Sequence, residues 1–218
     1  MSDPADVLAP SPTAAELTHA IRTAIIQGDY SPNQRLVEAD LNAEYGASRS
    51  VIRTALLKLA NDGLVDRLPN RGARVRAVTI DEAVEIFEVR IGLESLCASK
   101  AAERITDQQI IEMMALRAEL LESAAAGDMN RYSELNWVLD ERIRAISQHG
   151  AASTILGNVR AQSVRVQFRL AYQFGRAAIS APEHAEIIDA IASRDPEAAS
   201  AATVRHLLGV IEAVRALA

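Results

Sequence analysis

The sequence contains a single cysteine, Cys97, so the chain cannot form an internal disulfide bond. Proteins that do without disulfides are typical of reducing compartments, which predicts a cytoplasmic location. Cys97 lies in an alanine-rich stretch with helical periodicity. In such a stretch a buried, inert thiol is favoured over a nucleophile.

Long apolar runs are also missing, since none approaches the roughly 18–20 residues that a membrane-spanning helix needs. The first residues are acidic and lack the basic and then apolar pattern of a signal peptide, so residues 1–12 are predicted to be a disordered lead-in. Aromatic residues make up only 4% of the chain. The core must therefore consist of Ala, Leu, Ile and Val side chains on closely packed helices, and we expect no membrane partner.

Charge is unevenly divided along the chain. The net charge of −6 argues against a nucleic-acid partner at first sight. Residues 46–78, however, hold seven basic and two acidic side chains, while residues 79–218 hold 14 basic and 20 acidic ones. A basic segment on an acidic protein is typical of a DNA-binding module joined to a separate sensing domain.

The N-terminal part has the element order of a winged helix-turn-helix. Helices are predicted over residues 13–28, 38–45 and 48–61, with Gly46 in the turn and Ser48 as an N-cap. Two short strands, 64–68 and 73–78, follow and are joined by the basic turn Pro69-Asn70-Arg71-Gly72. The order predicts a DNA-binding domain over residues 13–78.

The start of the third helix is the predicted recognition element. Ser48 and Ser50 can bind phosphates, and Arg49 can reach a guanine edge in the major groove. Arg53 lies one turn further on the same face. In the wing, Arg71 and Arg74 can reach phosphate or the minor groove, and Gly72 allows close backbone approach. The alternative is that each arginine merely belongs to a solvated helix face.

Everything after Thr79 is predicted to be helical, which makes the protein mainly α, with an antiparallel helical bundle over residues 79–218. Capping signals occur at Thr79 with Glu82, at Thr106 with Gln109, at Ser180 with Glu183 around Pro182, and at Asp195 before Pro196. Helices are expected near residues 80–103, 107–126, 128–148, 151–175, 183–193 and 196–216.

Four polar residues stand out in these helices: Asn136, Asp140, His184 and His206. Asn136 and Asp140 are four residues apart and share a helix face. Two imidazoles and a carboxylate can bind a divalent metal and leave positions open for a ligand. A partly buried, hydrogen-bonded histidine is the ordinary alternative for each imidazole.

Residues Gln34–Val75 resemble the DNA-binding domain of the GntR family of bacterial transcription regulators. The matching motifs are Arg35-Leu36, Glu38-x-x-Leu41, Gly46-x-Ser48-Arg49, Arg53-x-Ala55-Leu56, Asp62-Gly63-Leu64-Val65 and Arg71-Gly72-Ala73-x-Val75. The resemblance implies that the operator is contacted by Arg35, Ser48, Arg49, Ser50, Arg53, Arg71 and Gly72. Three positions depart from the family pattern: Ala39, Thr54 and the turn Ser31-Pro32-Asn33.

The helical half is similar to the FCD ligand-binding domain of the FadR-type branch of that family. The matching segments are Phe87–Arg90 with Leu93-Glu94, Ala101-Ala102, Asn136-x-x-Leu139-Asp140, Glu183-His184 with Ile187, Ala190 and Ile191, and Arg205-His206-Leu207. Many members hold zinc or nickel with one Asp and three His, and Asn136 and Asp140 alter two of those four ligands. The resemblance therefore implies a site for zinc, nickel or manganese, or no metal at all.

The family's effectors are mostly small organic acids, and Arg90 is the candidate that would bind the carboxylate. An ion pair between Arg90 and Glu94, one helical turn on, is the alternative. The sequence thus predicts a metabolite-responsive regulator, in most cases a repressor, that binds operator DNA as a homodimer and is not an enzyme. A metal-dependent enzyme built on the bundle and a ligand-free DNA-binding protein remain as alternatives.

Overall fold

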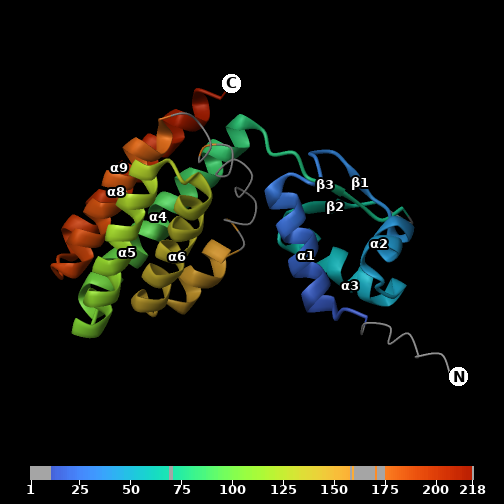
Figure 1. Ribbon diagram of the computed structural model, residues 1–218, viewed down its shortest axis with the longest axis horizontal. Helices are drawn as coiled ribbons and strands as arrows, with labels where there is room; N and C mark the ends of the chain where they lie inside the picture. The colour runs from blue at the N-terminus through green and yellow to red at the C-terminus, as the bar shows by residue number, and fades with distance from the viewer. Residues whose placement is uncertain (1–10, 69–70, 158, 160–169, 171–174, 218) are drawn as a thin grey trace, which may run out of the picture. The chain divides into compact units, whose positions relative to one another are not determined.

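The computed structural model describes residues 11–68, 71–157, 159, 170 and 175–217 (Figure 1). The chain divides into two compact units, which we call the N-terminal unit (Met1–Ala77) and the C-terminal unit (Val78–Ala218). Nearly all of the predicted lead-in, residues 1–12, lies outside the described residues, as do Pro69 and Asn70 of the predicted wing turn. No helix in the described ranges is long and apolar enough to cross a membrane.

Three helices form most of the N-terminal unit: α1 (Ala14–Gln27), α2 (Glu38–Tyr45) and α3 (Arg49–Asn61). Thr13 and Glu16 cap α1 reciprocally, and Gly28 ends it with φ of 95°. Apolar residues at helical spacing on α1 and α3 are fully buried, and they pack together as the core: Leu17, Ile21, Ile25, Ile52, Ala55, Leu56 and Leu59. The carboxylate of buried Asp62 ties both helices by pairing with Arg22 of α1 and Lys58 of α3.

A three-stranded antiparallel sheet completes this unit, with β1 (Arg35–Leu36), β2 (Val65–Arg67) and β3 (Ala73–Val75) in the order β1-β3-β2. The sequence pattern predicted β2 and β3, although as longer strands than they are, and it gave no sign of β1. A strand of two residues has no alternation to detect, and β1 exists because Arg35 pairs with Arg74 and Leu36 with Ala73.

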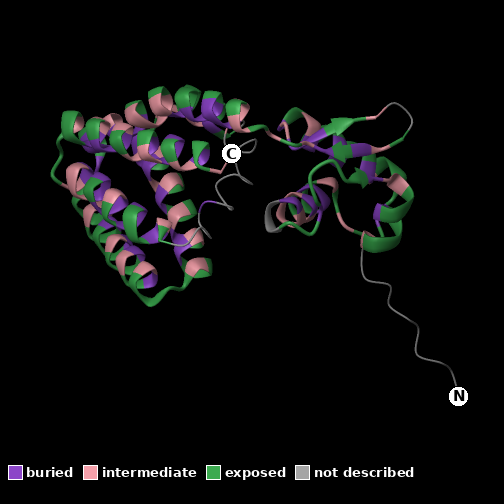
Figure 2. Ribbon diagram, turned by 90° about the horizontal axis from the view of Figure 1, so that it is seen from above, coloured by how far each residue is buried: buried purple, intermediate pink, exposed green. Residues whose placement is uncertain are grey.

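The C-terminal unit is a helical bundle made of α4 (Ile80–Arg104), α5 (Asp107–Ala126), α6 (Met129–Ser147), α8 (Arg176–Ala192) and α9 (Pro196–Arg215). Helix α4 packs on α6 and α9, and α5 packs on α6 and α8. Figure 2 shows the buried residues on the inward faces of the helices. Small side chains such as Ala98, Ala101 and Ala102 are fully buried, as a core poor in aromatic residues requires. Cys97 is buried as well, and this burial raises the pKa of its thiol.

One predicted boundary in this unit is wrong. The helix expected to begin near residue 183 begins at Arg176, so that Pro182 lies inside α8. Burial of Ala177, Ser180 and Ala181 on the packed face offsets the cost of a proline within a helix. Of the helix predicted over 151–175, residues 151–157 are helical, and most of the remainder lies outside the described residues.

Candidate functional site

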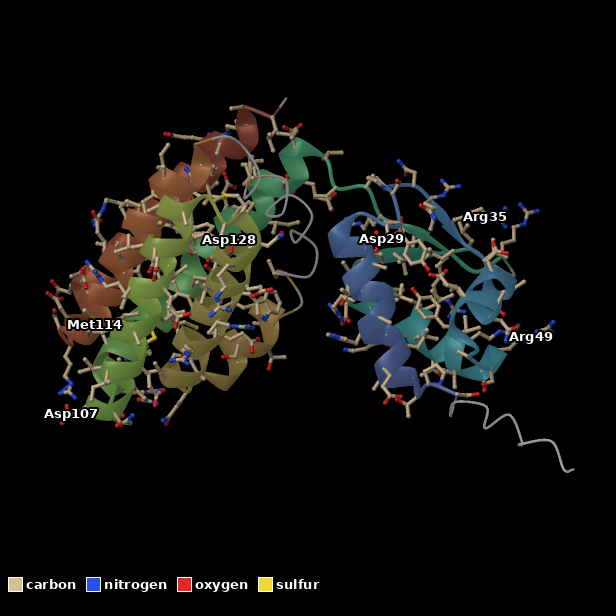
Figure 3. All side chains as sticks on the ribbon, in the orientation of Figure 1. Asp29, Arg35, Arg49, Asp107, Met114 and Asp128 are labelled. Carbon is tan, nitrogen blue, oxygen red and sulfur yellow. The ribbon has the colours of Figure 1, made fainter. Side chains whose placement is uncertain are left out.

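The start of α3 presents the predicted DNA-reading residues to solvent. Ser48 is the N-cap, and its Oγ accepts a hydrogen bond from the Val51 amide at 3.4 Å and lies 3.0 Å from the Ser50 Oγ. Ser48, Arg49 and Ser50 are all exposed. In Figure 3 the side chains of Arg35 and Arg49 extend outward from this unit. The free amides of a helix N-terminus and exposed cationic side chains suit a polyanion.

Arg53 is held by a carboxylate from another helix. Its Nε donates to both oxygens of Glu38 on α2, at 3.0 and 3.1 Å, while the arginine side chain remains 64% exposed. This role of Glu38 was not predictable from the sequence, because 15 residues separate the partners and the α2–α3 packing brings them together. Glu38 therefore restricts the directions in which Arg53 can reach.

The sheet gathers three arginines around a hollow at the wing. Arg35 and Arg74 are directly paired across β1 and β3, and Arg35 Nη2 donates to the Arg71 carbonyl at 3.5 Å. Together with Leu68 these residues line a hollow of about 380 Å³. Like charges directly opposite one another on a sheet are destabilising, so this arrangement favours a bound anion such as a phosphate.

Gly72 is where this hairpin requires glycine. Its φ is 83°, and a Cβ added there would overlap the carbonyl oxygen of Leu36. Gly72 therefore lets β1 approach the wing closely enough for Arg35 and Arg71 to meet.

In the C-terminal unit, four helices surround a cavity of about 60 Å³. It is lined by all the residues predicted for the metal and effector sites: Arg90, Asn136, Asp140, His184 and His206. A smaller hollow of about 30 Å³ is also lined by Asp140, His184 and His206. The structure thus brings these five side chains together, while their roles stay predictions.

The two imidazoles are in direct contact, and the other ring nitrogen of each contacts a further side chain. His184 Nε2 and His206 Nε2 lie 3.1 Å apart, the Tyr132 hydroxyl is 3.1 Å from His184 Nδ1, and His206 Nδ1 is 2.8 Å from Glu183 Oε2. Burial raises the pKa of Tyr132, so its hydroxyl stays protonated. One arrangement satisfies every contact with neutral rings: Tyr132 donates to His184, His184 donates to His206, and His206 donates to Glu183.

The same pair fits part of a metal site. Two ring nitrogens 3.1 Å apart can share one ion at the usual distance of about 2.0–2.1 Å, and the contacts at both Nδ1 atoms are those that orient metal-binding histidines. The described residues nevertheless contain no group of three His, Cys, Asp or Glu that could hold a metal as they stand. Asp140 or Asn136 would have to turn toward the imidazoles to complete the set.

Arg90 adopts the ion-pair alternative. Its Nε donates to Glu94 Oε1 at 2.7 Å, its guanidinium lies 4.6 Å from the centre of the Phe87 ring, and the residue is 2% exposed. A second arginine of the cavity wall, Arg176, was missed by the sequence analysis and has no motif that would have revealed it. Tyr132 was also missed, although its position four residues before Asn136 places it on the same helix face.

Comparisons with known proteins agree with this geometry. The family model described as "FCD domain" matches residues 85–209, and the one described as "Bacterial regulatory proteins, gntR family" matches residues 13–75. The Nta operon transcriptional regulator of Aminobacter aminovorans is 28% identical over 182 residues, covering 82% of this chain and 83% of that protein. The HTH-type transcriptional repressor RspR of Escherichia coli (strain K12) is 23% identical over 204 residues, covering 94% and 90%.

Among solved structures, E. coli McbR/YncC matches with a TM-score of 0.81 at 19% identity, covering 94% of this chain and 97% of that one. A putative transcriptional regulator GntR from Rhodococcus sp. RHA1 matches with a TM-score of 0.75 at 23% identity, covering 93% and 97%. These matches show the same fold. The relatives compared by sequence are transcriptional regulators rather than enzymes. The chain therefore belongs to the GntR family of bacterial transcription regulators and is a DNA-binding regulator whose FCD domain senses an effector.

Proposed function

We propose that this regulator is a repressor that leaves its operator when a small organic acid binds in the cavity of the C-terminal unit. The observation that carries the proposal is the convergence of two largely buried arginines and two imidazoles on one cavity of the C-terminal unit. Such a set of donors suits a carboxylate. The repressor assignment is supported by two relatives, the HTH-type transcriptional repressors RspR and GlaR of Escherichia coli (strain K12), which are 23% and 24% identical to this chain.

On the DNA, Arg49 and Arg53 are proposed to read base edges in the major groove, because they lie on the exposed face at the start of α3. Phosphates are proposed to bind along the helix N-terminus and the wing, through Ser48, Ser50, Arg35, Arg71 and the backbone at Gly72. Arg74 joins the phosphate set because it faces Arg35 across the sheet.

Homodimerisation is part of the proposal. Val89 and Leu96 lie seven residues apart on α4, which places them on one face, and they are 51% and 36% exposed. Exposed apolar side chains of this kind suit a contact between two copies. Val89→Glu should shift the protein to the monomer in light scattering after size exclusion, whereas Ile111→Glu on α5 serves as a control of equal chemistry.

A divalent ion, if bound, would be held by His184 and His206, with Asp140 and Asn136 supplying oxygen. It would offer open positions to a carboxylate ligand. Zinc, nickel and manganese are the candidates. Elemental analysis of the native protein tests this: about one ion per chain, lost in His206→Ala, supports the site, and a metal-free native protein contradicts it.

The experiment for the whole proposal begins with selection of duplexes from a random pool by the full-length protein. We expect a short pseudo-palindrome to emerge, as two recognition helices require. Short organic acids are then titrated into the complex, and its dissociation is followed by fluorescence anisotropy. A coupling of about 1–3 kcal/mol would weaken binding roughly 5- to 150-fold. If no acid changes operator affinity while the protein binds its selected duplex, acid sensing is wrong.

A further inference from the structure

We infer that Arg176, rather than Arg90, binds the carboxylate of the effector, and that the effector is a short hydroxy acid. The inference rests on the proposed function, namely that the cavity between α4, α6, α8 and α9 senses a small organic acid.

Arg176 is a buried cation with an unused donor. It is the first residue of α8, its side chain is 10% exposed, and it lines the cavity. Its Nη2 is completely buried and finds no hydrogen-bond acceptor within the described residues. Leaving a buried charged donor unsatisfied is costly, so an acceptor is expected at this atom.

The nearby carboxylate of Glu183 does not fill that role. Glu183 Oε2 forms an ion pair with Arg176 Nη2 at 3.5 Å but no hydrogen bond with it, and the same oxygen is 2.8 Å from His206 Nδ1. The pair sits beside Gly209 of α9, where an added Cβ would come within 3.3 Å of Glu183 Oε1. Glu183 thus lies beside the guanidinium of Arg176 without satisfying its outer nitrogen.

Arg90 is engaged by contrast. Its Nε is bonded to Glu94 within its own helix, and its guanidinium stacks on Phe87. A ligand that recruited Arg90 would have to compete with a carboxylate one turn away. Among the described residues, Glu183 lies 3.5 Å from Arg176 Nη2 and makes no hydrogen bond with it, so Arg176 is the better anchor.

Two rows of polar side chains in the cavity wall determine which further groups the ligand should carry. On α8, Arg176, Ser180 and His184 follow one another at intervals of four residues, and on α6 the residues Tyr132, Asn136 and Asp140 do the same. All six line the cavity. Ser180 can donate to a carboxylate held by Arg176, while the Asp140 carboxylate, which can only accept hydrogen bonds when ionised, suits a hydroxyl of the ligand.

The size of the space sets the length of the ligand. One water needs about 10–15 Å³ of such a cavity, so a cavity of about 60 Å³ has room for about four to six atoms of water size. It suits a chain of two to four carbons better than a long acyl chain. The class is therefore a short hydroxycarboxylate.

The test is calorimetric titration of the full-length protein with glycolate, L-lactate, D-lactate and glycerate, and with the uncharged amide of each, with and without zinc. Wild type should bind at least one acid about tenfold or more tightly than its amide. Arg176→Gln should weaken the acid about 10- to 100-fold and leave the amide unchanged, because it removes one charged hydrogen bond. Arg205→Gln, an exposed arginine of α9, is the matched control and should behave as wild type.

A merely structural role for Arg176 would weaken acid and amide alike, so the ratio of the two affinities decides the question. If Arg176→Gln fails to fold, Arg176→Lys replaces it, and this variant should keep the preference for the acid at several-fold lower affinity. A preference that survives in Arg176→Gln but vanishes in Arg90→Gln overturns the inference and leaves acid sensing intact. If wild type binds no acid of the panel while other short acids bind, the hydroxy-acid assignment fails, and if no short acid binds, the proposed function fails with it.

Discussion

Replacing Gly72 with alanine should uncouple the wing from the rest of the N-terminal unit. Two costs add at this position. A side chain at φ of 83° costs about 1–2 kcal/mol, because the left-handed region disfavours a Cβ. The new Cβ would also overlap the Leu36 carbonyl oxygen and lie 3.2 Å from its carbon, and relieving such overpacking costs typically about 1–3 kcal/mol. We expect a total loss of about 2–5 kcal/mol.

The matched control is Gly28→Ala in the same unit. Gly28 has φ of 95°, yet an added Cβ would meet nothing within 4 Å, so only the backbone cost of about 1–2 kcal/mol applies. The difference between the two variants isolates the contact with Leu36.

The chain allows the two units to be followed separately during unfolding. Its only tryptophan, Trp137, belongs to the C-terminal unit, so tryptophan fluorescence reports that unit, while circular dichroism reports both. Gly72→Ala should lower the midpoint of the dichroism transition that fluorescence does not report, to well below its value in Gly28→Ala, and leave the fluorescence transition in place. It should also weaken operator binding, because β1 carries Arg35. Equal losses of stability in the two variants would refute the reasoning.

Three other variants probe single contacts. Glu38→Gln loosens Arg53 by removing the negative charge that holds it, so anisotropy should show a smaller ratio of operator to scrambled-duplex affinity. An unchanged ratio would argue against a positioning role. Hydrogen bonds from Thr13 hold the pKa of Glu16 below its ordinary value of 4.5, so the contribution of Glu16 to stability is present above pH 4.5 and is lost as the pH falls below that value. Glu16→Gln should therefore make the melting temperature depend less on pH in this acid range, and an unaltered pH profile would contradict the assignment. Asp62→Ala removes the shared partner of Arg22 and Lys58 and should lower the free energy of unfolding, measured by denaturant titration, by about 1–3 kcal/mol. A loss below about 0.5 kcal/mol would count against a stabilising role of these ion pairs.

Local signals predicted most of the fold. Capping pairs such as Thr13 with Glu16 and Thr106 with Gln109 lie within one helical turn, so the sequence alone located those helix starts. Strand β1 and the early start of α8 were not predictable in this way. Both depend on partners distant in sequence: β1 on its pairing with β3, and the first turns of α8 on burial within the bundle.

The same distinction, between local sequence signals and contacts made by packing, applies to the candidate sites. The histidines and Asn136 and Asp140 were singled out by spacing and by resemblance to a family, and the bundle gathers them in one cavity. Arg176 and the Glu38–Arg53 contact carried no local signal, because what matters about each is a neighbour supplied by packing. Burial and hydrogen-bond satisfaction, which a sequence does not display, revealed both.

The salt dependence of operator binding is the most direct test of the central claim, which is that the arginines of α3 and the wing bind duplex DNA. The logarithm of the association constant should fall linearly with the logarithm of salt concentration, with a slope of about −0.9 for each phosphate contacted. The double variant Arg71→Gln/Arg74→Gln should make the slope shallower by about 1.8, and Arg131→Gln/Arg142→Gln in the C-terminal unit should not change it. An unchanged slope in the wing variant, with an unchanged affinity when Arg49 and Arg53 are neutralised, would contradict the account.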